Sequence, residues 1–98
     1  MKIIWSPLAV DRASEIAEYI SLDNPTAAKK WINDIFKKVL ILKSSPQIGR
    51  TVPEINRKEI REVIFGNYRI IYRIERLNIS ILTIRHTKQI LPIDEPMA

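Results

Sequence analysis

In the first half of the chain, apolar residues recur at steps of three and four, the spacing of one face of a helix. The first such segment spans about residues 7–21 and the second about residues 25–43. A Ser-Pro pair precedes the first and an Asn-Pro pair the second. Ser and Asn cap the free N–H groups of a helix, and proline suits its first turn. Because only a short link joins the two segments, they are predicted to form an antiparallel helix hairpin.

Beyond residue 58 the pattern changes to the alternation that is typical of strands. Four strands are predicted in the chain: Lys2–Trp5, Ile60–Phe65, Tyr68–Glu75 and Ile79–His86. Residues 46–58 lack a period and hold two prolines and a glycine, so they are predicted to be a connecting loop. The order of elements predicts an α+β fold. In it, the N-terminal strand and helix hairpin precede a three-stranded antiparallel meander, and the helices pack on one face of the sheet.

The alternation also assigns side chains to the two faces of this sheet. The face that the helices should cover carries Tyr68, Ile70, Tyr72 and Ile74. Arg69 and Arg73 lie on the opposite face, which is expected to meet solvent or a partner. If the Gly-Asn turn has two residues, Glu62 opposes Ile71 and reaches either arginine. A longer turn or a bulge would shift that register by one residue.

Length and composition narrow the class of protein. The chain has 98 residues, of which 46% are hydrophobic and 28% charged, so residues 1–98 are expected to form one domain with a loosely held tail at 89–98. Without cysteine, disulfides and thiolate sites are excluded. No apolar run approaches the ~20 residues that span a bilayer, and the N-terminus does not resemble a signal peptide. A small cytoplasmic protein is expected, without membrane association.

The net charge of +5 is concentrated in the second half of the chain. Residues 47–90 hold nine basic and four acidic side chains, and seven of the nine are arginines. Arginine presents a planar donor fork to phosphate or carboxylate, so an anionic partner is expected, either nucleic acid or an acidic protein. A solvated basic face is the alternative. His86 with Asp94 or Glu95 makes only a weak ligand set, so neither a metal nor a cofactor is predicted.

Several short sequence motifs follow one another along the chain in a recognisable order. They are Ser44-Ser45-Pro46-Gln47-Ile48-Gly49-Arg50, Val52-Pro53-Glu54, Arg61-Glu62, Tyr68-Arg69-Ile70-Ile71-Tyr72-Arg73-Ile74 and Ile81-Leu82-Thr83-Ile84-Arg85-His86. With this length and order of elements, the chain resembles the RelE/ParE superfamily of toxins from bacterial and archaeal type II toxin–antitoxin modules. The resemblance covers nearly the whole chain, and it implies growth inhibition that a cognate acidic antitoxin neutralises within a hetero-oligomer.

The superfamily has two branches on one scaffold, so the fold does not decide the activity. The RelE-like branch implies a ribosome-dependent mRNA endoribonuclease, for which this chain offers Arg61, Arg69 and His86. That set is incomplete, because Val63 stands at a second basic position and no tyrosine follows Tyr72. The ParE-like branch, which implies a block of DNA gyrase, is therefore favoured. A degenerate member that only binds its antitoxin is the third hypothesis.

Whichever target applies, one basic surface is expected to bind it or the antitoxin. The residues predicted for this surface are Arg61, Arg69, Arg73, Arg85, His86 and Lys88. Strand parity places Arg85 and His86 on opposite faces, so only one of them can point with Arg69. As an exposed side chain, Arg69 should tolerate truncation to alanine at a cost within about 0.5 kcal/mol.

Overall fold

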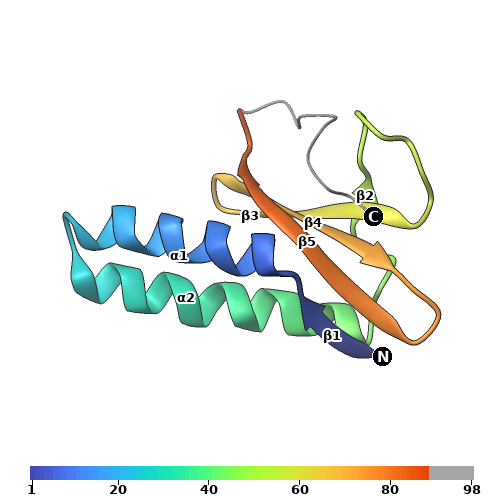
Figure 1. The fold of residues 1–98 in the computed structure, drawn as a ribbon, viewed down its shortest axis with the longest axis horizontal. Coiled ribbons are helices and arrows are strands. Elements are labelled where there is room, and N and C mark those ends of the chain that lie inside the picture. The colour runs from blue at the N-terminus through green and yellow to red at the C-terminus, as the bar shows by residue number, and fades with distance from the viewer. Residues whose placement is uncertain (89–98) are drawn as a thin grey trace.

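The computed structural model describes residues 1–88 and contains two helices beside a five-stranded sheet (Figure 1). The elements are β1 (Lys2–Trp5), α1 (Pro7–Ser21), α2 (Pro25–Leu40), the 3₁₀ turn η1 (Ile41–Lys43), β2 (Arg50–Thr51), β3 (Ile60–Phe65), β4 (Tyr68–Ile74) and β5 (Asn78–His86). The predicted α+β class and the four predicted strands are confirmed. The sequence pattern missed the two-residue strand β2, which lies inside the predicted loop.

Both helices begin where their caps predict. The Ser6 hydroxyl accepts a hydrogen bond from the Ala9 N–H at 3.0 Å, and Asn24 Oδ1 accepts one from the Ala27 N–H at 3.1 Å. Pro25 stands in the first turn of α2, where its missing N–H costs nothing. The second helix ends at Leu40, three residues before its predicted end, and its last turn tightens into η1.

The strands follow the order β1-β5-β4-β3-β2, with β1 parallel to β5 and the other pairs antiparallel. The two-residue turn at Gly66 is confirmed, and the positive φ of 58° at Gly66 fits this tight turn. Glu62 accordingly opposes Ile71, as the pattern predicts. A bulge interrupts the pairing of β4 with β5 between Ile71 and Tyr72.

The helix pair covers one face of the sheet, as predicted, and encloses the larger core. In Figure 1 the two helices lie side by side to the left of the sheet, and β5 runs diagonally past their right-hand ends. Four side chains at the centre of this core are fully buried: Ile35, Ile70, Tyr72 and Ile84. Tyr68 and Ile74 pack against the core at its margins, so the predicted helix-facing set of β4 is confirmed.

The opposite face of the sheet is not open at its centre, contrary to the prediction. Val52 in the segment between η1 and β3 is fully buried, and it packs with Ile60, Ile71 and Leu82 in a second, smaller core. Ile71 and Leu82 present apolar surface on this face, and covering that surface is favourable. A segment without hydrophobic period therefore acts as a strap across the sheet. We call residues 44–59 the strap.

No helix within residues 1–88 is long and apolar enough to cross a membrane. The tail predicted to be loosely held, residues 89–98, lies outside the described residues.

Candidate functional site

Arg69, the residue predicted to project from an open face, is instead buried beneath the strap. Only 5% of its surface is exposed. Its Nε donates to Glu62 Oε1 at 2.7 Å, while Nη1 and Nη2 each donate to a different oxygen of Glu54 at 2.8 Å. The prediction of a solvent-facing Arg69 is wrong because the strap places a carboxylate directly over the guanidinium. This two-pronged geometry is the strongest form of an arginine–carboxylate pair.

The charges around Arg69 are balanced. Glu62, with 1% of its surface exposed, also accepts from Arg50 Nε at 2.6 Å, so two arginines face two carboxylates. The hydrogen bonds that Arg69 donates to Glu54, and secondarily to Glu62, raise the pKa of Arg69 above its ordinary value, although burial opposes the shift. The fork of Arg69 is therefore occupied by protein carboxylates, and phosphate would have to displace Glu54.

Arg61 lies on the other face of the sheet and supports the start of the strap. Its Nη1 donates to the Gly49 carbonyl at 2.9 Å and its Nε to the Lys58 carbonyl at 3.1 Å. Across the strand pair from Arg61, the Tyr72 hydroxyl donates to the Pro46 carbonyl at 2.7 Å and accepts from the Gly49 N–H at 3.0 Å. Burial raises the pKa of this hydroxyl. Arg61 thus contributes to holding the strap.

Two further predicted residues lie at the margins of the sheet. Arg73 is half-buried opposite Ile60. A hydrogen bond from the Glu59 backbone N–H is the main cause that lowers the pKa of Glu59, and Arg57 and Arg73 add to this shift. Lys88 is exposed at the end of the described chain. Arg73 and Lys88 therefore both lie near solvent, but they do not form one site together.

His86 lies at the far end of β5, and it faces the helices. It opposes Tyr68, with ring centroids 5.7 Å apart, and its Nδ1 accepts a hydrogen bond from the Lys88 N–H at 3.1 Å. Because Nδ1 is an acceptor, the neutral ring carries its proton on Nε2. Arg85 pairs with Arg69 across the two strands, and His86 pairs with Tyr68. The prediction that Arg85 and His86 lie on opposite faces of the sheet is therefore confirmed. The three residues considered for a nuclease centre therefore lie in three different environments.

A groove between α1 and the end of β5 contains two of the predicted residues, Arg85 and His86. Its volume is about 640 Å³, and its wall consists of Arg12, Glu15, Ile16, Tyr19, Tyr68, Ile84, Arg85 and His86. We call this the α1–β5 groove. The sequence pattern did not predict the contribution of Arg12 and Tyr19 to this groove. Their helical period marks them only as surface positions, and the packing of α1 against β5 is not encoded locally.

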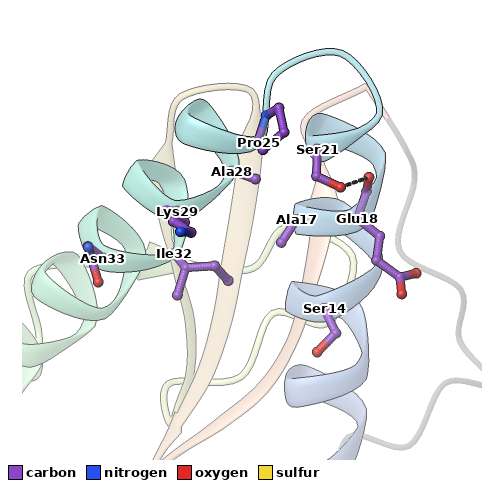
Figure 2. A pocket seen from close by; sticks show the side chains of 9 residues that line it. All are labelled: Ser14, Ala17, Glu18, Ser21, Pro25, Ala28, Lys29, Ile32 and Asn33. Atoms are coloured by element: carbon purple, nitrogen blue, oxygen red, sulfur yellow. Dashed lines mark hydrogen bonds between the residues drawn. The ribbon is translucent and has the colours of Figure 1, made fainter.

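A second hollow, of about 660 Å³, lies between the two helices (Figure 2). Figure 2 shows the small or apolar side chains of Ala17, Ala28 and Ile32 facing it, and a hydrogen bond of 2.7 Å from the Ser21 hydroxyl to the Glu18 carbonyl at its edge. None of the residues predicted to bind a target lines this hollow. Within residues 1–88, no three His, Cys, Asp or Glu side chains come together as metal ligands.

The sequence matches a family of toxins, and the fold matches a solved structure. The model of the family described as "ParE toxin of type II toxin-antitoxin system, parDE" matches residues 3–91. A protein of Sinorhizobium fredii (strain NBRC 101917 / NGR234), named "Putative toxin Y4kP", is 36% identical over 93 residues, which cover 93% of each chain. The structure titled as a chromosomal ParDE TA system from P. aeruginosa has the same fold, with a TM-score of 0.73 at 24% identity over 88% of this chain and 95% of that one. The chain therefore belongs to the ParE family of toxins from type II toxin–antitoxin systems.

Proposed function

We propose that this ParE-family toxin inhibits growth by blocking DNA gyrase and that a cognate acidic antitoxin neutralises it. One observation supports this choice over RNA cleavage, namely the separation of Arg61, Arg69 and His86. Metal-free cleavage by a 2′-hydroxyl needs a base, an acid and cations around a single phosphate. Here Arg69 is covered by Glu54, Arg61 donates to backbone carbonyls, and His86 lies at the far end of β5.

Val63 supports the same choice. It stands where the RelE-like pattern has a second basic residue, and it is 8% exposed in the core beneath the helices. A valine neither donates a hydrogen bond nor titrates, so this position offers nothing to a phosphate. Inhibition of gyrase by binding needs a complementary surface and no such catalytic set.

Parallel assays on the purified protein test the proposal. DNA supercoiling by gyrase should be inhibited in proportion to the toxin added, and ribosome-bound mRNA should remain intact. Cuts at defined codon positions would overturn the proposal in favour of the nuclease, and His86→Ala would then show whether the histidine participates. Activity in neither assay would favour a member that only binds its antitoxin. Heat-unfolded toxin at the same concentration is the control for nonspecific inhibition by a basic polypeptide.

Neutralisation by an acidic antitoxin has a kinetic signature. The surplus of +5 in residues 47–90 should attract an acidic chain and speed its encounter with the toxin. The association rate constant should therefore fall about tenfold or more between low and high salt, since charge steering is screened. Stopped-flow fluorescence of the two tryptophans can follow this rate. A rate constant that does not change with salt would contradict the electrostatic account.

A further inference from the structure

The helix hairpin has an outer side, which does not face the core, and this side carries an apolar seam. Small or apolar side chains line the hollow between the two helices there, among them Ser14, Ala17, Ser21, Ala28 and Ile32 (Figure 2). The seam continues along the helices with Val10, Phe36 and Leu40, which expose 48%, 47% and 56% of their surface. Phe36 is held by an edge-on contact with Trp5, whose ring centroid lies 5.0 Å away. An exposed apolar seam of this kind marks an interaction site.

The two helices flank the seam with opposite charges. α1 contains three acidic side chains and one arginine, whereas α2 contains four lysines and one aspartate. Asp11 and Glu18 lie seven residues apart on one side of α1, and Lys29 and Lys37 lie eight residues apart on one side of α2. All four side chains are exposed, and Glu18 and Lys29 line the hollow itself. We call the seam together with these four charged residues the hairpin face.

A face with one acidic edge and one basic edge complements itself. When a two-fold axis perpendicular to the hairpin face relates two copies, α1 of each copy lies on α2 of the other. Full overlap of the hairpins places this axis beside Ser14, at the middle of α1. Glu18 lies about one helical turn from Ser14 toward the link between the helices, and Lys37 lies about one turn from the axis in the other direction. The rotation therefore brings Glu18 to the partner's Lys37 and Asp11 to the partner's Lys29.

The mixed charge of the hairpin face argues against other partners. An acidic protein surface or a nucleic acid would place negative charge against Asp11 and Glu18. A helix that lies on a membrane needs a wide apolar face, and the widest apolar faces of α1 and α2 already pack in the larger core. A second copy satisfies both charged edges. The hairpin is about 22 Å long and about 20 Å wide, so roughly 400–600 Å² per copy would be buried, and the dimer should be reversible.

We propose that two copies of the toxin associate through their hairpin faces about a two-fold axis beside Ser14. Glu18 of each copy then pairs with the partner's Lys37, and Phe36 enters the partner's hollow. The hollow and the α1–β5 groove share no lining residue, so the dimer leaves the groove of each copy open. This inference concerns the toxin alone and does not depend on its target.

Sedimentation equilibrium of the purified toxin tests the association. Across the micromolar range the mean mass should rise from that of one chain to that of two. Glu18→Lys and Lys37→Glu should each weaken the dimer about tenfold, because each places two pairs of like charges across the axis. The two substitutions in one chain should restore the affinity to within about threefold of the parent. Lys58→Glu, which makes the same charge change at an exposed lysine of the strap, is the matched control and should have less than a twofold effect.

Mixing the two single variants tests the two-fold arrangement directly. Glu18→Lys has two cations on its hairpin face where Lys37→Glu has two carboxylates, so an equimolar mixture should form heterodimers at least as tight as the parent dimer. Ser14→Arg places two arginines together at the axis and should abolish the dimer. Its matched control is Ser45→Arg in the strap, because both serines are exposed in the monomer. Urea unfolding of each variant shows that it is folded.

The other outcomes overturn the proposal. A mass of one chain at every concentration would exclude the dimer, and a dimer that Glu18→Lys and Ser14→Arg leave unchanged would use another surface. If the toxin stays monomeric and Lys37→Glu abolishes its binding to gyrase, the hairpin face belongs to the target. If a monomeric toxin cosediments with phosphatidylcholine vesicles containing one-third phosphatidylglycerol, and Lys37→Glu prevents this, the face belongs to a membrane. Because the mass is measured without gyrase or antitoxin, failure of the proposed function leaves this result unaffected.

Discussion

Replacing Arg69 by alanine should destabilise the protein strongly, because the side chain joins the strap to the sheet. The substitution removes three hydrogen bonds of 2.7–2.8 Å to Glu62 and Glu54. Glu54 is partly exposed and can return to water, whereas the side chain of Glu62 is fully buried. The variant therefore leaves a buried carboxylate with one fewer cation.

The size of the loss in the free energy of unfolding depends on the carboxylate that Arg69→Ala leaves buried, that of Glu62. Breaking a buried ion pair by removing one partner costs about 3–5 kcal/mol. Glu62 keeps its pair with Arg50, so we expect the lower end, a loss of ~3 kcal/mol in the free energy of unfolding. For a domain of this size, such a loss lowers Tm by roughly 12–24 °C. This is several times the ~0.5 kcal/mol expected for truncating an exposed arginine.

Urea unfolding followed by tryptophan fluorescence measures the loss, with Arg57→Ala as the control for an exposed arginine of the strap. A second variant, Arg69→Leu combined with Glu62→Leu, tests the cause. If the penalty comes from an uncompensated buried charge, an apolar pair at the same positions should recover much of the stability. A loss below about 1 kcal/mol in Arg69→Ala would refute the view that Arg69 fastens the strap.

Three further predictions concern the start of the strap and the larger core, which the helices cover. Gly49→Ala should cost at least ~2 kcal/mol in thermal unfolding, because a Cβ there would lie 2.5 Å from the Tyr72 hydroxyl and the overlap forces backbone or core shifts. Tyr72→Phe should cost about 1–3 kcal/mol at pH 7, since the Pro46 carbonyl and Gly49 N–H lose their partner. Because burial raises the pKa of Tyr72, the folded state retains its proton longer. The parent should therefore lose stability as pH rises above about 10, and pH-dependent urea melts should show a smaller decline in the variant. Ile70→Ala should cost ~2–5 kcal/mol by cavity formation, measured by urea unfolding against Ile64→Ala, whose parent side chain is 47% exposed.

The parts of the fold that the sequence predicted are those with a local physical cause. Capping side chains set the start of each helix, and their hydrogen bonds form within three residues. A Gly-Asn pair between two alternating segments determined the register of β3 and β4, so the contact of Glu62 with Arg69 could be expected from pairing alone. These features do not depend on how distant segments pack.

The burial of Arg69 could not be predicted, because it depends on the strap, whose sequence has no hydrophobic period. Arginine is rarely buried unless it is paired, and one predicted partner, Glu62, was not enough to indicate burial. The second partner, Glu54, comes from a segment that seemed only to connect two elements. The α1–β5 groove was missed for a similar reason, since Arg12 becomes a neighbour of Arg85 only through the packing of α1 beside β5.

The short sequences that carry the resemblance to the toxin superfamily converge on the strap. Gly49 lies against the Tyr72 hydroxyl and accepts from Arg61, while Glu54 and Glu62 hold Arg69. These contacts between the short sequences hold the strap on the sheet. In this chain these short sequences therefore account for how the strap is held, and they do not by themselves indicate a target. Loss of toxicity in Arg61 or Arg69 variants therefore identifies a binding contact only if the variant protein is first shown to be folded.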